Sequence, residues 1–294
     1  MGLHAWGNDT DELEMIAAVE TALDNGVTLF DTADVYGLGT SESILGNALG
    51  RRRSMAKIAT KFGVRRTDDG RSFYDNSPDW IDLALDASLK RLGTDYIDLY
   101  QVHYYDGVTP LVDLFGHLEK KRTEGKILAY GISNVCDFGN DELLNLDTIS
   151  MEYSLANREH ESAIRKLKKE KDLTFFSWGS LGQGVLAGIY DQFSVFDGND
   201  RRSRETYTNF HGEKFKHNLA IVEEMRGVSR DLGKTLPQIA IRWILDYLMG
   251  SNVVLVGIKR SSDIKEAVGA FDWKLTGEAV SLLESISRNG AFPK

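Results

Sequence analysis

The segment "NGVTLFDTADVYGLGTSESILGNALG" (residues 25–50) reads as a strand, a turn and a helix in succession. The run "VTLFD" is short, β-branched and apolar, which predicts a buried strand over 27–31. The following "TSESILGNALG" predicts a helix with Thr40 or Ser41 as its N-cap and Gly50 at its end. Asp31 and Tyr36 therefore lie where a strand passes into a helix. Taken alone, such residues often serve only the loop, with the acid accepting backbone hydrogen bonds.

The same alternation continues along the chain. Apolar runs predict strands over 3–6, 27–31, 57–62, 96–103, 127–133, 148–153, 173–178 and 253–257. Helical patterns lie between them: Asp9 is expected to cap a helix that ends at Gly26, and Ser77 with Pro78 to begin one that ends at Gly93. Eight such units in 294 residues predict an α/β fold with one (β/α)8 barrel domain over 1–294. The irregular segment 182–218 is expected to be a lid or substrate loop at the barrel mouth, with disorder as the alternative.

A doubly wound nucleotide-binding sheet is the competing fold. That fold carries G-x-G-x-x-G after its first strand. Here "GLGTSE" lacks the third glycine and "GSLGQG" has the wrong spacing. The pattern therefore favours the barrel.

Composition limits the partners. The net charge of -9 and a pI near 5.3 argue against a nucleic-acid or anionic membrane surface. No apolar run approaches the length of a membrane span, and the first residues lack the form of a signal peptide. A single cysteine, Cys136, excludes an intramolecular disulfide and suits a reducing compartment. We therefore expect a cytoplasmic protein without membrane or nucleic-acid partners.

A barrel would bring the polar residues at its strand ends to one mouth. Asp31, Lys61 and His103 finish or follow three of the predicted strands, and Tyr36 follows Asp31 in the turn. A tyrosine gives up its proton too reluctantly to act as an acid at neutral pH, but a lysine ammonium held by an aspartate would lower its pKa. A histidine could bind a substrate oxygen or relay the proton. Each residue alone has a structural explanation, but together they predict a proton-donating site.

Other reaction classes fit less well. No G-x-S-x-G nucleophile turn is present, and the other histidines show no metal-ligand spacing. We expect no metal site.

The motifs "GVTLFDTADVYGLGTSESILGNAL", "IATKFG", "LYQVH", "YGISN", "MEYSLANRE" and "PQIAIRWIL" resemble those of the aldo-keto reductases, in that family's order and over nearly the whole chain. The resemblance implies an NAD(P)-dependent oxidoreductase that reduces an aldehyde or ketone, with Asp31, Tyr36, Lys61 and His103 as its catalytic tetrad. It also implies that Ser133 and Asn134 bind the nicotinamide carboxamide.

The resemblance extends to the other cofactor positions, with departures. Ser150 stands where the family has glutamine, Trp178 replaces the tyrosine that stacks on the nicotinamide, and Ser180 replaces a proline. The segment "VGIKRSSDIKEAVGA" matches the part that wraps the adenosine end. The resemblance thus implies cofactor binding by Ser133, Asn134, Ser150, Trp178, Gly179, Ser180, Leu181, Gln183, Gly257, Lys259, Arg260, Asp263 and Glu266.

Lys259 and Arg260 favour NADP, because the 2′-phosphate of this cofactor needs cationic donors. The negative charge of Asp263 would oppose that phosphate, so NAD stays an alternative cofactor. Asp263 as a helix cap is an equally good interpretation. The family's N-terminal hairpin and long C-terminal loop are expected to be absent, which suggests an open site for a bulky carbonyl substrate such as a sugar derivative. A redox-sensing regulatory subunit, as in the family's potassium-channel β-subunits, is the alternative function, and a barrel that only scaffolds a partner is a third.

Overall fold

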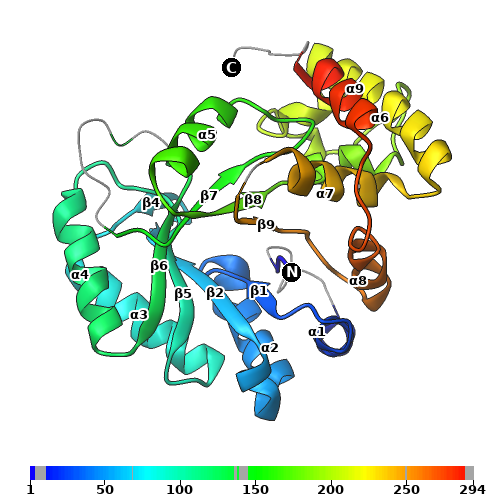
Figure 1. The fold of residues 1–294 in the computed structure, drawn as a ribbon. Coiled ribbons are helices and arrows are strands. Elements are labelled where there is room, and N and C mark those ends of the chain that lie inside the picture. Colours follow the sequence, from blue (N-terminus) through cyan, green and yellow to red (C-terminus); the bar gives the residue numbers. More distant parts are fainter. Residues whose placement is uncertain (4–10, 68, 136–137, 139–144, 249, 289–294) are drawn as a thin grey trace. The chain divides into compact units, whose positions relative to one another are not determined.

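The computed structural model describes residues 1–3, 11–67, 69–135, 138, 145–248 and 250–288 (Figure 1). Its strands are β1 (Leu29–Asp31), β2 (Lys57–Phe62), β3 (Val64–Arg66), β4 (Ser72–Tyr74), β5 (Ile97–Val102), β6 (Ile127–Ser133), β7 (Thr148–Glu152), β8 (Thr174–Trp178) and β9 (Asn252–Val254). Its α-helices are α1 (Glu12–Asp24), α2 (Thr40–Leu49), α3 (Pro78–Leu92), α4 (Leu111–Thr123), α5 (Glu161–Glu170), α6 (Gly212–Leu232), α7 (Leu236–Tyr247), α8 (Ser261–Val268) and α9 (Gly277–Arg288). Short 3-10 helices are η1 (Tyr36–Gly39), η2 (Gly50–Met55), η3 (Gly182–Ala187), η4 (Arg201–Ser203) and η5 (Thr208–Phe210).

The fold is α/β, with a seven-stranded sheet in the order β1-β2-β5-β6-β7-β8-β9. The register is parallel from β1 through β7. These seven strands coincide with seven of the predicted runs, although β1 and β9 are shorter than expected. Most of the predicted strand over 3–6 falls outside the described residues, but Gly2 forms parallel bridges with Asp31 and with Gly257. The strand and the helix predicted within residues 25–50 are therefore present as β1 and α2.

The chain divides into two compact units. The first unit comprises Met1–Met151, Leu167–Phe176 and Gly257–Lys265, and the second comprises Glu152–Lys166, Ser177–Val256 and Glu266–Lys294. Within the described residues, no helix combines the length and the apolar character needed to cross a membrane. The predicted lid over 182–218 runs through η3, η4 and η5 into α6.

Helix ends in the first unit follow local chemistry. Ser77 caps α3 through its hydroxyl, Pro78 is in the first turn, and Gly93 ends the helix with φ of 62°, all as predicted. The predicted N-cap of α2 was wrong: Gly39 holds that position with φ of 90°, a left-handed conformation that glycine adopts without strain. The cap of α1 is Asp11 rather than Asp9, which lies outside the described residues.

The sequence did not predict the antiparallel pair β3–β4 in the first unit. Val64 pairs with Tyr74, and Arg66 pairs with Ser72. The two strands are three residues long and carry mostly exposed side chains. Such strands lack the buried alternation that marks a strand in sequence.

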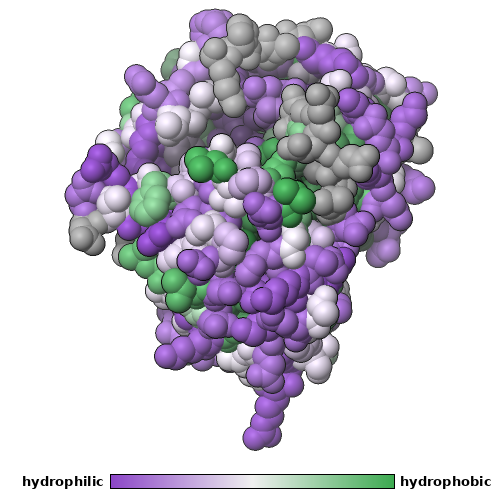
Figure 2. All heavy atoms as spheres, turned by 90° about the vertical axis from the view of Figure 1, so that its left-hand side faces the viewer, coloured by the Kyte–Doolittle hydropathy of each residue, from purple (hydrophilic) through white to green (hydrophobic). Residues whose placement is uncertain are grey.

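The face on which α3 and α4 lie is mostly hydrophilic (Figure 2). Leu83 on α3 and Val112 on α4 are among the exposed apolar side chains of the described residues. Scattered apolar residues of this kind are ordinary on soluble surfaces.

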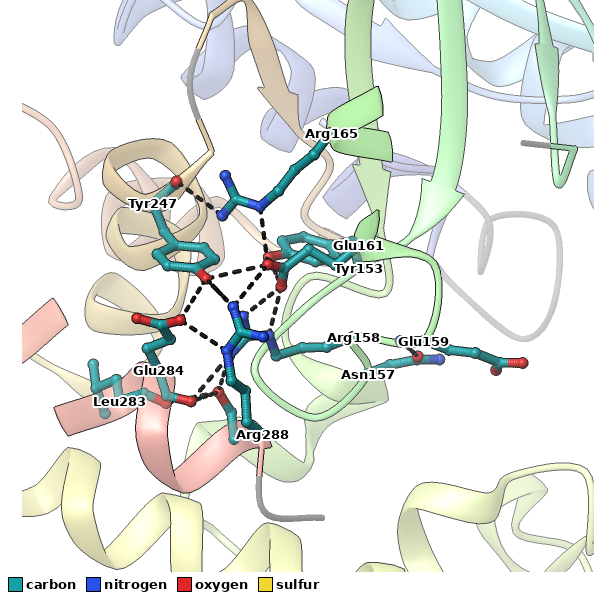
Figure 3. Close-up of polar contacts among 11 residues, drawn as sticks. Tyr153, Asn157, Arg158, Glu159, Glu161, Arg165, Tyr247, Leu283, Glu284 and Arg288 are labelled. Atoms are coloured by element: carbon teal, nitrogen blue, oxygen red, sulfur yellow. Dashed lines mark hydrogen bonds and ion pairs between the residues drawn. The ribbon is translucent and has the colours of Figure 1, made fainter. Parts of the chain in front are cut away.

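In the second unit a charged cluster joins the start of α5 to α7 and α9 (Figure 3). Arg158 donates to Glu161 at 2.6 Å, to the Tyr247 hydroxyl at 2.8 Å and to Ser287 at 2.9 Å. Its guanidinium also lies 5.3 Å from the Trp243 ring centroid. Because Arg158 and Glu161 have side-chain exposures of only 8% and 9%, each compensates a charge that burial would otherwise penalise.

Candidate active site

Four of the predicted site residues lie at or next to strand ends of the first unit. Asp31 ends β1, Lys61 is the penultimate residue of β2, His103 follows β5, and Ser133 ends β6. Parallel register carries these ends to one edge of the sheet. The expectation that strand-end residues converge is met for these strands.

Asp31 and Lys61 form a buried ion pair. The Lys61 ammonium lies 2.7 Å from each Asp31 carboxylate oxygen and 2.9 Å from the Thr32 carbonyl. Asp31 is 4% exposed and Lys61 is 3% exposed. The ammonium therefore keeps a fixed position and a full set of acceptors.

Tyr36 faces this pair from the η1 turn. Its ring centroid lies 5.5 Å from the Lys61 ammonium and 5.7 Å from the His103 ring, which meets it edge-on at 84°. Gly37 and Leu38 both adopt left-handed φ values, 57° and 54°, so the turn that carries Tyr36 is tightly wound.

The Tyr36 pKa differs from the expectation that Lys61 would lower it. Burial raises the pKa well above the ordinary tyrosine value, and the charges of Asp31 and Asp34 raise it further. The negative charge of Asp31 thus offsets the effect that the Lys61 ammonium would have on the Tyr36 pKa. Tyr36 therefore holds its proton at neutral pH, which is the state that a proton donor requires.

The sequence interpretation missed a buried acidic group beside Tyr36. Asp34 has a buried carboxylate oxygen with no hydrogen-bond partner among the described atoms. Burial, together with the charge of Glu42, raises the pKa of Asp34 to about 7. Glu42 is fully buried, accepts from Thr60 at 2.6 Å and pairs with Arg91 at 2.6 Å. In the sequence, the only sign that Asp34 lies near the site was its position in the same turn as Tyr36.

His103 is held by its main chain and by neighbouring rings. Its amide donates to the Phe62 carbonyl at 2.8 Å, and its carbonyl accepts from Asn134 Nδ2 at 3.0 Å. Burial and the Lys61 charge lower the His103 pKa to about 3. The imidazole is therefore neutral at physiological pH, so it can donate a hydrogen bond from one nitrogen only.

His103 and Asp34 make opposite contributions to the pH dependence of stability. Between pH values of about 3 and 6.5 the unfolded histidine binds a proton that the folded one does not, so its contribution to the free energy of unfolding rises with pH. Between about 4 and 7 the folded Asp34 holds a proton that the unfolded residue has lost, so its contribution falls with pH.

We expect His103→Asn and Asp34→Asn to tilt this pH dependence in opposite directions. Relative to wild type, His103→Asn removes a rise with pH and Asp34→Asn removes a fall, each by up to about 1.4 kcal/mol per pH unit. Urea unfolding at pH values between about 4.5 and 6.5 measures the slopes. Equal slopes for both variants and wild type would contradict these two protonation states.

The residues expected at the nicotinamide carboxamide lie side by side on β6 and β7. Ser133 and Ser150 are register partners, and the Asn134 amide donates to the Ser150 carbonyl at 2.8 Å. The Ser150 hydroxyl is buried without a hydrogen-bond partner among the described atoms. A buried hydroxyl of this kind fits a polar ligand group, because leaving it unpaired costs free energy. The side-chain nitrogen of Asn134 instead donates a hydrogen bond to the His103 carbonyl.

The second unit carries another group of the expected cofactor residues. Trp178 ends β8, and its indole nitrogen is buried without a described partner. The Gln183 amide contacts Glu152 at 3.4 Å and Asn209 at 3.1 Å. The Ser180 hydroxyl donates to the Ser177 carbonyl at 3.0 Å, so it is used within its own turn. Gly179 and Leu181 flank Ser180 in this turn, and Glu266 accepts through its carbonyl from Gln238 at 3.2 Å.

The segment expected at the adenosine end leads into the start of α8, which belongs to the first unit as far as Lys265. Lys259 and Arg260 are both exposed, and Gly257 bridges to Gly2. One Asp263 oxygen accepts from the backbone amides of Lys259 at 2.9 Å and Arg260 at 3.1 Å. Asp263 therefore acts as a cap for this turn, which is the structural alternative that the sequence left open.

Within the described part of the chain, no three His, Cys, Asp or Glu side chains gather in a way that could hold a metal ion.

The chain is similar to known proteins over nearly its whole length. A model of the aldo/keto reductase family matches residues 1–288. Aldo-keto reductase YhdN of Bacillus subtilis is 32% identical over 97% of this chain and 86% of that protein. Aldo-keto reductase yakc [NADP(+)] of Schizosaccharomyces pombe is 32% identical over 98% of this chain and 87% of its own length. The structure of glycerol dehydrogenase AKR11B4 from Gluconobacter oxydans superposes with a TM-score of 0.89 at 29% identity, covering 100% of this chain and 92% of that one.

Proposed function

The chain belongs to the aldo/keto reductase family, and on that premise we propose that it reduces an aldehyde or ketone to an alcohol with NADPH. The observation that carries the proposal is the buried Asp31–Lys61 pair beside the protonated Tyr36 phenol. The relatives named above are reductases or a dehydrogenase, so turnover is favoured over redox sensing.

In the proposed reaction NADPH, when bound, supplies a hydride to the carbonyl carbon. Tyr36 donates its proton to the carbonyl oxygen, so that no alkoxide charge accumulates. The Lys61 ammonium, fixed by Asp31, stabilises the phenolate that remains on Tyr36. The neutral His103 imidazole donates a hydrogen bond that orients the substrate oxygen.

We assign the cofactor contacts as the resemblance implies. In the first unit these are Ser133, Asn134 and Ser150 for the carboxamide, with Gly257, Lys259 and Arg260 for the adenosine end, where Asp263 holds the loop through the Lys259 and Arg260 amides. In the second unit Trp178 would stack on the nicotinamide, and Gly179, Ser180, Leu181, Gln183 and Glu266 would also bind the cofactor. The buried and unpaired Ser150 hydroxyl supports the carboxamide assignment.

We further propose that the sheet closes as a complete (β/α)8 barrel. Its support is the double bridge of Gly2, which pairs in parallel with Asp31 on one side and with Gly257 on the other. The first strand of a closed barrel would pair with a strand on each side in this way. The lid role of 182–218 and a cytoplasmic location remain predictions.

The substrate is a small carbonyl compound, and we propose a hydroxylated one. The glycerol dehydrogenase that superposes on this chain supports a polyol-related substrate, of which a sugar derivative is one case. NADPH oxidation with glyceraldehyde, dihydroxyacetone, aldoses and plain alkyl aldehydes tests both proposals. NADPH binding without turnover of any carbonyl would favour the redox-sensing alternative, and no cofactor binding would favour a scaffold.

We expect NADPH to bind more tightly than NADH, through Arg260. Because Asp263 is engaged by the backbone, its charge is compensated by two amides rather than directed at the ribose. Arg260→Ala should weaken NADPH binding about tenfold, or about 1.4 kcal/mol, and leave NADH binding unchanged. Competing dissociation constants measure this, with Asp263→Asn as the control that keeps the ratio of the two constants. Equal losses for both cofactors in Arg260→Ala would contradict a contact to the 2′-phosphate.

A further inference from the structure

Among the described atoms, the His103 imidazole has no hydrogen bond at Nδ1 that would orient its ring. That nitrogen is buried without a hydrogen-bond partner among the described atoms. Histidines that act at a site are usually oriented by a hydrogen bond from the other ring nitrogen. Something else must therefore prevent the ring from turning about its side-chain bonds.

A row of stacked rings meets this imidazole. Tyr104 lies nearly parallel to it, with centroids 5.0 Å apart and planes at 20°. Tyr74 of β4 lies nearly parallel to Tyr104 in turn, at 5.0 Å and 15°. Tyr36 meets the imidazole edge-on at 5.7 Å. We call the rings of His103, Tyr104 and Tyr74 the stacked row.

Hydrogen bonds fix the backbone beneath the stacked row. Asn76, which is fully buried, donates from its backbone amide to Asp106 at 2.9 Å and accepts from the Asp106 amide at 2.8 Å. Its side-chain nitrogen also donates to the Tyr104 carbonyl at 3.2 Å. The segment that carries Tyr104 is thereby tied to the chain just after Tyr74. Both ends of the Tyr74–Tyr104 contact are held.

We propose that Tyr104 and Tyr74 are positioning residues that set the plane of the His103 imidazole and so direct its hydrogen bond to the substrate oxygen. The inference rests on the proposed reduction. Aromatic pairs in this geometry contribute more stabilising free energy than the burial of their surface area alone would give. A neutral imidazole has one N–H, so a turned ring would present the wrong nitrogen or aim the donor away. This role requires the ring of each tyrosine and not its hydroxyl.

Removing the rings tests the proposal. Tyr104→Leu should lower kcat between about tenfold and a hundredfold, as small misplacements of a site group do, while the dissociation constant of NADPH stays unchanged. Tyr104→Phe should restore kcat to within about threefold, because it keeps the stacked ring. Tyr74→Leu should lower kcat less, and the double variant should lose less than the product of the two single losses.

Phe73→Leu is the matched control. Phe73 precedes Tyr74 in β4, so its side chain leaves the opposite face of the strand, where Arg65 lies 5.1 Å from its ring centroid. It is 39% exposed, against 46% for Tyr74. A general effect of disturbing the hairpin would appear in both variants. Equal losses in Phe73→Leu and Tyr74→Leu would overturn the proposal.

An NMR readout separates this inference from the proposed reaction. In protein labelled with 15N at histidine, His103→Asn identifies the ring signals of His103. We expect one neutral tautomer in wild type and in Tyr104→Phe, and shifted or broadened His103 signals in Tyr104→Leu and Tyr74→Leu. Unchanged signals in both Leu variants would overturn the stacked row as a positioning device, even if the wild type reduces no carbonyl. If Tyr104→Leu does not fold, the His103 signals of Tyr74→Leu still test the proposal, because Tyr74 is half-exposed and its replacement disturbs the fold less.

Discussion

Tyr36→Phe is expected to abolish carbonyl reduction while NADPH binds within a few-fold of wild type. Positioned general acids contribute about 10² to 10⁴ in rate, and the phenol is the only group that the proposed reaction uses as a proton donor. The phenylalanine ring keeps the packing against His103 and Lys61. The loss should therefore appear in kcat rather than in binding.

Single-turnover oxidation of NADPH with an active aldehyde measures this loss. Tyr96→Phe is the matched control, because Tyr96 precedes β5 whereas His103 follows it, so its ring lies at the opposite end of that strand, under Arg53. Reduction by Tyr36→Phe near the wild-type rate would reject Tyr36 as the proton donor. A similar loss in Tyr96→Phe would point to damage to the fold.

Breaking the buried pair should have the second largest effect. Asp31→Asn or Lys61→Met leaves one buried charge without its partner, which typically costs about 3 to 5 kcal/mol in the free energy of unfolding. The double variant should cost clearly less than the sum of the single variants, because it leaves neither charge unpaired. All three variants should lose carbonyl reduction, since Tyr36 then lacks the fixed ammonium.

Urea unfolding of the four proteins completes this cycle. Arg52 and Asp24 supply a control pair at 2.8 Å whose side chains are 33% and 69% exposed. Removing either partner there should cost less than about 1 kcal/mol, because water screens exposed charges. Additive losses at Asp31 and Lys61 would contradict a coupled buried pair.

The sequence predicted the features that depend on local periodicity. Runs of apolar residues located β1, β2, β5 and β6, and the parallel ends of these strands placed Asp31, Lys61 and His103 at one edge of the sheet. Helix signals such as Ser77 and Gly93 were also correct, because caps are chosen by the chemistry of neighbouring residues. The family motifs added the tetrad and the cofactor, which periodicity alone does not name.

Only the tertiary structure decided the electrostatics and the ring packing of the site. Lys61 was expected to lower the Tyr36 pKa, but burial and the charges of Asp31 and Asp34 raise it, and these effects depend on three-dimensional distance. The stacking of Tyr74 on Tyr104 joins residues thirty positions apart, and Tyr74 lies in a mostly exposed hairpin that has no buried alternation. Sequence patterns report which face of an element is buried, whereas pKa values and side-chain contacts depend on what folding brings against that face.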